Sequence, residues 1–249
     1  MKTAGIDIGS RTIEVVITED KRILDIRQTD SGFNPIVQVK KLLHGLSFDR
    51  LCATGYGRNL MEIEFDSPTV TEIKAYAKGS KALYPEATTV LDIGGQDCKV
   101  ISLFDDGRVR KFEMNDRCAA GTGKFLEIMA HTLGFEIADF GMNALEAQKD
   151  ITINSMCTVF AESEVISLIS KGEARNDIAG ALHMSVAKRA MSMLKRIGTN
   201  GSVVFAGGVA NNPCIRQLIS ELLGLSVYVP ENPQAVGAYG AALLAGEQL

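Results

Sequence analysis

Two short segments of the chain place an acidic residue directly before a glycine turn. Each reads Asp-Ile-Gly between runs of strand-forming residues, at Asp7-Ile8-Gly9 and at Asp92-Ile93-Gly94-Gly95. Glycine permits positive φ angles and lacks the Cβ that would block a phosphate, so backbone N–H groups can face an anion there. A carboxylate before the turn would repel a bare phosphate unless Mg²⁺ or an ordered water lies between them. The two aspartates therefore predict a site for a metal-bound nucleotide.

A third glycine turn supports this interpretation. One Asp-Ile-Gly segment alone is equally compatible with an ordinary hairpin turn whose aspartate is solvated. Gly207-Gly208 follows another run of buried-strand residues, within the segment 206–211. Three such turns in one chain favour a nucleotide site over three unrelated hairpins.

Other nucleotide-binding motifs fit the sequence poorly. The segment Gly121-Thr122-Gly123-Lys124 lacks the first glycine of a Walker A loop, because Cys118 stands five residues before Gly123. Phe125 stands where Ser or Thr would bind Mg²⁺. No Gly-x-Gly-x-x-Gly pattern follows a predicted strand, which disfavours a dinucleotide site.

Two cysteines lie in segments where a loop is expected to lead into a helix: Cys118 within 115–127 and Cys157 within 155–164. A helix N-terminus carries a partial positive charge, which lowers a thiol pKa and favours a thiolate bound to an iron–sulfur cluster. A four-iron cluster needs four ligands, so two copies of the chain would each have to donate both cysteines. From spacing alone, the commoner explanation is that both are small buried hydrophobic residues.

The elements that position these residues repeat along the chain. The alternation of apolar residues predicts a hairpin over 4–17, a strand over 22–28, a helix over 34–46, a strand over 51–54 and a helix over 71–83. After Pro85 the order repeats, with strands predicted at 89–93, 99–103 and 109–114. The rest is predicted to be mostly helical, with strands at 202–206 and 225–229, a helix after Pro213 and a closing helix at 235–245. This echo predicts an internal duplication.

Composition limits the class of protein. The 249 residues suit one large domain or two joined halves, and 46% apolar residues are enough for a packed core. The net charge of −4 comes from interspersed charges, which predicts no binding to nucleic acid or to an anionic membrane. Without an apparent signal peptide or a long apolar run, we expect a cytoplasmic protein. Five scattered cysteines, an odd count, disfavour a disulfide scaffold.

In this order, the three glycine turns resemble the two phosphate motifs and the adenosine motif of the actin and hexokinase superfamily. The resemblance implies an α/β chain with the actin-like ATPase fold, in which the nucleotide lies between two ribonuclease-H-like halves. We expect the first half to comprise residues 1–75, completed by a C-terminal helix over 235–249, and the second half to comprise residues 76–234.

The two cysteine segments, together with 53–58 and 92–97, closely resemble the activators (component A) of 2-hydroxyacyl-CoA dehydratases. The same family includes ATP-binding subunits of benzoyl-CoA reductase and reductases of double-cubane-cluster proteins. The resemblance implies a homodimer that shares one 4Fe-4S cluster, bound by Cys118 and Cys157 of each subunit. It further implies that hydrolysis of ATP to ADP drives low-potential single-electron transfer to an iron–sulfur acceptor protein, with a ferredoxin or flavodoxin as the donor.

The resemblance also assigns roles to individual residues. Asp7 and Asp92 would act through Mg²⁺ and water, and Gln96 would orient the attacking water. The residues expected to contact the nucleotide are Gly9, Ser10, Arg11, Thr12, Gly94, Gly95, Gly121, Thr122, Gly123, Lys124, Gly207, Gly208, Val209 and Asn211. The remaining cysteines and the histidines are expected to be structural: Cys52, Cys98, Cys214, His44, His131 and His183.

The first phosphate turn departs from the family pattern. Relatives commonly read Gly-Ser-Thr followed, after two intervening residues, by Lys, whereas this chain has Arg11 at the Thr position and Glu14 at the Lys position. Arg11 either replaces the missing lysine charge or is a surface residue of the hairpin.

Two other functions share some of these features. A small-molecule kinase of the same fold, such as a pantothenate or sugar kinase, would share the phosphate motifs but would not need the cysteine segments. A non-catalytic nucleotide-binding protein could use the two cysteines for a disulfide.

Overall fold

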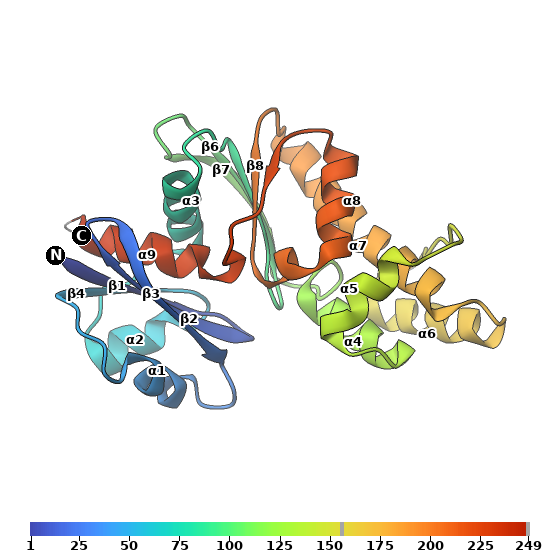
Figure 1. Ribbon diagram of the computed structural model, residues 1–249, viewed down its shortest axis with the longest axis horizontal. Coiled ribbons are helices and arrows are strands. Elements are labelled where there is room, and N and C mark those ends of the chain that lie inside the picture. The colour runs from blue at the N-terminus through green and yellow to red at the C-terminus, as the bar shows by residue number, and fades with distance from the viewer. Residues whose placement is uncertain (155–156, 248–249) are drawn as a thin grey trace.

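The computed structural model describes residues 1–154 and 157–247, which fold around two β-sheets (Figure 1). Ser155 and Met156, which belong to the second cysteine segment, lie outside the described residues, as do the last two residues of the predicted C-terminal helix. The sheets have the strand orders β3-β2-β1-β4 and β7-β6-β5-β8-β9. In each, a three-stranded antiparallel meander is followed by a strand parallel to its first member.

The first sheet consists of β1 (Lys2–Ile8), β2 (Thr12–Glu19), β3 (Arg22–Asp30) and β4 (Arg50–Thr54). Alternate residues of its strands point to opposite faces, so both faces need cover. On one face, Ile6 and Val15 pack with residues of α1 (Pro35–Leu43) and α2 (Arg58–Phe65). On the other face, Val16 packs against the last helix, α9 (Val236–Gly246). Figure 1 shows α9 and the α1–α2 pair on opposite sides of this sheet.

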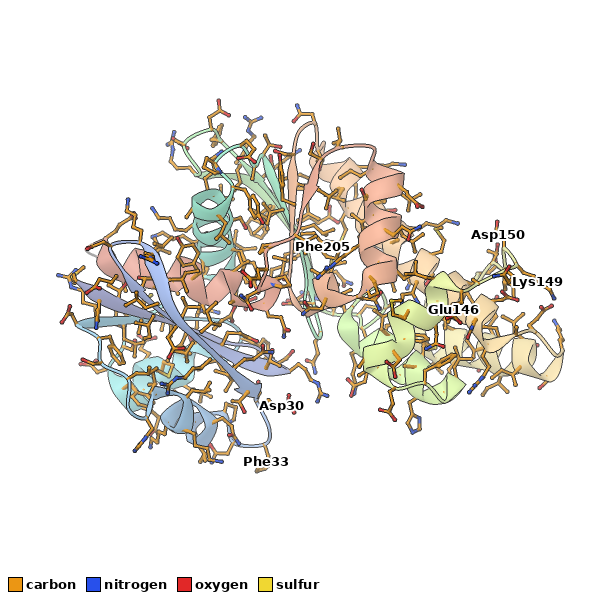
Figure 2. The ribbon with its side chains drawn as sticks, viewed as in Figure 1. Asp30, Phe33, Glu146, Lys149, Asp150 and Phe205 are labelled. Carbon is orange, nitrogen blue, oxygen red and sulfur yellow. The ribbon has the colours of Figure 1, made fainter. Side chains whose placement is uncertain are left out.

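The second sheet repeats this order with β5 (Thr89–Ile93), β6 (Cys98–Leu103), β7 (Val109–Asn115), β8 (Val203–Ala206) and β9 (Val227–Tyr228). Val90 and Ile101 pack on the side of α3 (Glu72–Leu83). Leu91, Val100 and Phe205 belong to the larger core, which includes α4 (Gly123–Leu133), α7 (Arg175–Ile197) and α8 (Pro213–Leu223). Figure 2 labels Phe205 in the interior of the molecule.

Helices α4, α5 (Ile137–Leu145) and α6 (Thr158–Ser170) extend to the side of the molecule away from the first sheet (Figure 1). The segment after α5 carries Glu146, Lys149 and Asp150 at this end (Figure 2). In the described residues, two short 3-10 helices, η1 (Gly208–Asn211) and η2 (Pro233–Ala235), precede α8 and α9 in the chain. In the part of the chain that the structure describes, no helix is both long and apolar enough to cross a bilayer.

Helix α9 joins the first sheet to α3 through backbone-to-backbone packing. A Cβ on Gly5 of β1 would overlap the carbonyl oxygen of Ala238, and a Cβ on Gly240 would overlap that of Ala75 in α3. Only glycine permits such close approach, which explains the small residues of this buried helix. Helix α9 thereby fixes α3 and the carboxyl end of β1, where Asp7 lies.

The predicted order of elements is confirmed, including the internal echo. Helix α2 was not predicted, and β9 is shorter than the strand expected over 225–229. The expected boundary between halves at residues 75 and 76 falls within α3, and the division into halves stays a prediction.

Candidate functional site

A cavity of about 550 Å³ lies between the two sheets, at the carboxyl ends of β1 and β5. Asp7 and Asp92 both line it, so the internal echo brings the two predicted aspartates to one place. Most residues expected to bind the nucleotide also line it: Gly9, Ser10, Arg11, Thr12, Gly94, Gly95, Gly123, Lys124, Gly207, Gly208, Val209 and Asn211, together with the predicted catalytic residue Gln96.

The two phosphate turns have the same geometry. The amide of Gly9 donates to the carbonyl of Thr12 at 3.0 Å, and the amide of Gly94 donates to the carbonyl of Asp97 at 2.9 Å. The turns also approach each other, because a Cβ on Gly95 would lie 2.9 Å from the Cβ of Arg11. Both turns therefore lie on the same cavity, as a shared polyphosphate requires.

A glycine at the end of a parallel strand makes room for each aspartate. Gly55 follows β4 with φ +92°, and Gly207 follows β8 with φ +84°. A Cβ on Gly55 would overlap Asp7 Oδ1, and one on Gly207 would overlap Asp92 Oδ1. Each site therefore needs glycine for two reasons, the left-handed backbone and the space that the carboxylate fills.

Lys99 of β6 forms a buried ion-pair network that the sequence analysis missed. Its Nζ lies 2.7 Å from Glu72 Oε2, 3.1 Å from Asp92 Oδ2 and 2.6 Å from Asp97 Oδ2. Burial alone would lower the pKa of Lys99, but Asp92, Glu72 and Asp97 outweigh burial and raise that pKa above its ordinary value. Lys99 therefore stays charged and holds one oxygen of Asp92 in place.

Burial raises the pKa of both aspartates above the ordinary value of a carboxyl group. Burial raises the pKa of Asp92 to about 6 despite the opposing charge of Lys99. Burial, followed by the nearby charges of Glu72 and Glu14, raises the pKa of Asp7 well above its usual range. In the described residues, Asp92 Oδ1 has no hydrogen-bond partner. A cation in this cavity would satisfy that oxygen and offset the excess of negative charge.

Glu14 lies directly across from Asp7 in the β1–β2 ladder and also lines the cavity. Its side chain is only 4% exposed. Burial raises the pKa of Glu14 to about 7, partly opposed by a hydrogen bond from Thr12 and reinforced by the charge of Asp92. At neutral pH, this site therefore contains a carboxylate that is costly to ionise.

This cost predicts a pH-dependent stability difference for Glu14→Gln. The folded-state pKa of about 7 exceeds the ordinary value of 4.5, so the contribution of Glu14 to stability is present below pH 4.5 and is lost as pH rises through 7. Without nucleotide or divalent cation, the variant should be more stable than the wild type by about 2 kcal/mol at pH 8. Urea unfolding at pH 5 and pH 8 measures the difference, which should shrink at pH 5. An equal difference at both pH values would contradict the interpretation.

The predicted adenosine turn connects to the first phosphate turn through Gln234. Asn211 Nδ2 donates to Gln234 Oε1 at 3.0 Å, and Gln234 Nε2 donates to Thr12 Oγ1 at 3.3 Å. Ile137, Ala138 and Pro213 add apolar cavity lining near this turn. Sequence reasoning missed these residues because α5 and α8 reach the cavity only through tertiary packing.

The N-terminus of α4 is attached directly to the second phosphate turn. The amide of Gly123 donates to the carbonyl of Gly94 at 2.9 Å, and the amide of Lys124 donates to that of Gly95 at 2.8 Å. Gly121 and Thr122 do not line the cavity, because Thr122 caps α4 and bonds Ala119 while Gly121 packs on Arg189. Their nucleotide contacts stay a prediction.

The structure describes the surroundings of Arg11. This side chain lines the cavity and forms an ion pair with Glu127 of α4 at 3.7 Å. Lys124 contacts the same carboxylate at 3.4 Å. Arg11 thus connects the first phosphate turn to α4 although its side chain is 60% exposed, and its contact with phosphate stays a prediction.

The five cysteines divide by exposure. Cys118 and Cys157 are exposed, whereas Cys52, Cys98 and Cys214 are buried. Burial raises the pKa of both Cys52 and Cys214 to about 11, as expected of packing residues. Cys157 caps the N-terminus of α6, as predicted. Cys118 lies in the loop before α4, four residues ahead of the cap Thr122, so the expected position at a helix start is wrong for this cysteine.

Comparison with known proteins gives a consistent result. A family model described as the BadF/BadG/BcrA/BcrD ATPase family matches residues 4–245. The 2-hydroxyisocaproyl-CoA dehydratase activator of Clostridioides difficile is 39% identical over 100% of this chain and 96% of its own length.

Two solved structures have nearly the same fold. Component A of the Acidaminococcus fermentans (R)-2-hydroxyglutaryl-CoA dehydratase matches with a TM-score of 0.93 and 38% identity, covering 100% of this chain and 98% of that one. The Clostridium difficile 2-hydroxyisocaproyl-CoA dehydratase activator with bound ADPNP matches with a TM-score of 0.92 and 40% identity, covering 100% and 95%. These matches confirm the predicted family resemblance and the actin-like ATPase fold.

Proposed function

The chain belongs to the BadF/BadG/BcrA/BcrD ATPase family. We propose that it is an ATP-dependent activator of an iron–sulfur enzyme. In this proposal, two copies of the chain share one 4Fe-4S cluster and pass single low-potential electrons to a partner of the 2-hydroxyacyl-CoA dehydratase or double-cubane-cluster type. The observation that carries the proposal is the combination, in one chain, of an acidic cavity with two exposed cysteines, of which Cys118 lies in the loop before α4, the helix whose first residues bond the second phosphate turn.

The cavity suits a nucleotide with Mg²⁺. The unpartnered Asp92 Oδ1, within the described part of the chain, offers a ligand for the metal or its water shell, and the glycines of both turns leave space for phosphates. Bound Mg²⁺ would neutralise charge on the phosphates and on Asp7 and Asp92. Gln96 lines the cavity beside the second turn, from which we propose that it orients the attacking water.

Cys118 and Cys157 suit a cluster held between two subunits. Within residues 1–154 and 157–247, no three Cys, His, Asp or Glu side chains are grouped closely enough to bind a metal, so one copy of the chain cannot supply four ligands. The guanidinium of Arg189 lies within electrostatic range of Cys118, so a positive charge would lie beside an anionic cluster bound there. A cluster shared by two subunits would store the electron that is transferred.

The surface beside Cys157 suits contact with a second subunit. Val159 and Phe160, in the first turn of α6, are 66% and 68% exposed. Apolar side chains at this position would be covered if two copies brought their Cys157 residues together.

The donor that reduces the cluster would be a ferredoxin or a flavodoxin.

Anaerobic purification tests this proposal. We expect a brown dimer that absorbs broadly near about 400 nm, as iron–sulfur clusters do, and hydrolyses ATP with Mg²⁺ without any sugar or vitamin acceptor. A colourless protein that transfers phosphate to a metabolite would instead establish the kinase alternative. A colourless protein that binds nucleotide without turnover and forms a disulfide would establish the non-catalytic alternative.

A further inference from the structure

The cavity is lined by a cluster of acidic side chains whose negative charge exceeds the positive charge of Lys99. We define this cluster by five carboxylates that line the cavity together with Lys99 in the described part of the chain: Asp7, Glu14, Glu72, Asp92 and Asp97. Glu72, Asp92 and Asp97 all contact Lys99 directly. Asp7 and Glu14 are not among the ion-pair partners of Lys99 in the described residues, and a bound triphosphate would add further negative charge beside them.

The internal echo shows where the imbalance arises. In the second half, Asp92 faces Lys99 across the β5–β6 ladder. In the first half, Asp7 faces Glu14 across the β1–β2 ladder, at the matching position. Residues directly opposite on antiparallel strands have Cβ atoms about 5 Å apart, so each pair shares one local environment. The first half therefore has two carboxylates where the second half has a carboxylate and an ammonium group.

A buried oxygen of Glu14 indicates what is missing. Among the residues that the structure describes, Glu14 Oε1 has no hydrogen-bond partner although the side chain is 96% buried. Burying a carboxylate oxygen without a hydrogen-bond donor costs free energy. Such an oxygen is expected to take up a proton, accept a hydrogen bond or bind a cation. The neighbouring cationic side chains Arg11 and Lys124 do not contact this oxygen and instead form ion pairs with Glu127 of α4.

We propose that Glu14, with Asp7 opposite it, holds a second divalent cation when nucleotide is bound, in addition to the Mg²⁺ expected at Asp92. The cation takes the place that an ammonium group has in the second half. In the described residues, the protein alone has no group of three metal ligands, so phosphate oxygens and waters have to complete the coordination. Pairs of divalent cations that clamp phosphate oxygens are common in phosphoryl-transfer sites. This inference rests on the proposed nucleotide site.

Manganese serves as the probe, because it replaces Mg²⁺ and its free form is measured by electron paramagnetic resonance. At saturating ADPNP, the wild-type protein should bind two Mn²⁺ per subunit. Glu14→Gln and Glu14→Lys should each bind one, since the first removes the charge and the second supplies the ammonium group. Glu127→Gln, a carboxylate that lines the same cavity outside the acidic cluster, should keep two.

The dependence of nucleotide affinity on Mg²⁺ provides a second readout. Below saturation, a tenfold rise in free Mg²⁺ should tighten ADPNP binding by about 100-fold in the wild type and by about tenfold in Glu14→Gln. Urea unfolding establishes that each variant is folded.

The outcomes are distinguishable. One Mn²⁺ per subunit in the wild type would overturn the second cation site but leave the nucleotide site standing. Two Mn²⁺ per subunit in folded Glu14→Gln would also overturn it, because the second cation would then not depend on this carboxylate. Failure of the wild type to bind ADPNP at any Mn²⁺ concentration would overturn the proposed function together with this inference.

Discussion

Asp92→Asn is expected to lower the rate of ATP hydrolysis by at least about 100-fold while changing ADP affinity by less than about tenfold. Asparagine has nearly the same size and can still accept a hydrogen bond from Lys99, as Asp92 Oδ2 does now at 3.1 Å. It cannot supply the negative charge that Asp92 offers to a cation from its unpartnered Oδ1 within the described site. That charge matters most when charge redistributes in the transition state, so turnover should fall more than binding.

Steady-state hydrolysis and calorimetric titration with ADP measure the two effects. Asp106→Asn, in the exposed turn between β6 and β7, is the matched control and should retain both activities. Hydrolysis by Asp92→Asn at the wild-type rate would contradict the assigned role of Asp92.

Cys118→Ser and Cys157→Ser are each expected to abolish cluster binding. Each substitution removes two of the four thiolates from a symmetric dimer, and a serine hydroxyl is a poor ligand for iron. Iron and sulfide analysis after anaerobic reconstitution should fall from about four iron atoms per dimer to nearly none. ATP hydrolysis should persist, because neither cysteine lines the nucleotide cavity.

Cys52→Ser is the matched control for this experiment. Cys52 lies on β4 and is fully buried among apolar residues, so it is too remote from solvent to bind a shared cluster. The variant should keep its iron even if it is less stable. A complete four-iron complement in Cys118→Ser would refute the ligand assignment.

The fold was predictable because its signals are local. Apolar alternation and glycine turns mark the strands of both meanders, and the echo between residues 4–17 and 89–103 indicated the duplication. Helix α2 was not predicted because only Met61 of its eight residues is buried, so the sequence shows no clear apolar stripe there. Within the expected strand 225–229, the residues that pair with β8 in the ladder are Val227 and Tyr228.

The candidate site was predictable only in part. The aspartates and glycines of the turns were predictable because they form the recognisable Asp-Ile-Gly motif. Glu72 was not, because it reaches Lys99 from α3 through tertiary packing. Lys99 did leave a signal, because it follows Asp92 at the same interval as Glu14 follows Asp7. The loop position of Cys118 could not be derived, since the start of α4 depends on the hydrogen bonds from Gly123 and Lys124 to the second phosphate turn.

Those same hydrogen bonds provide the route by which ATP would act on the cluster. The turn that would contact the phosphates bonds the first residues of α4, and the loop carrying Cys118 directly precedes that helix. Arg11 adds a second link, from the first phosphate turn to Glu127 of α4. A change of phosphate occupancy at the two turns would therefore shift α4 and the cysteine loop in both subunits, which would alter access to the cluster.

The most direct test is the rate at which a chelator removes iron from the anaerobic dimer, measured with ADP and with ADPNP at the same Mg²⁺ concentration. The account predicts rates that differ by about fivefold or more between the two nucleotides, because binding coupled across a two-state element changes exposure at the distant site. Identical rates with ADP and ADPNP, in protein shown to bind both nucleotides and a full cluster, would contradict the claim that ATP controls the cluster.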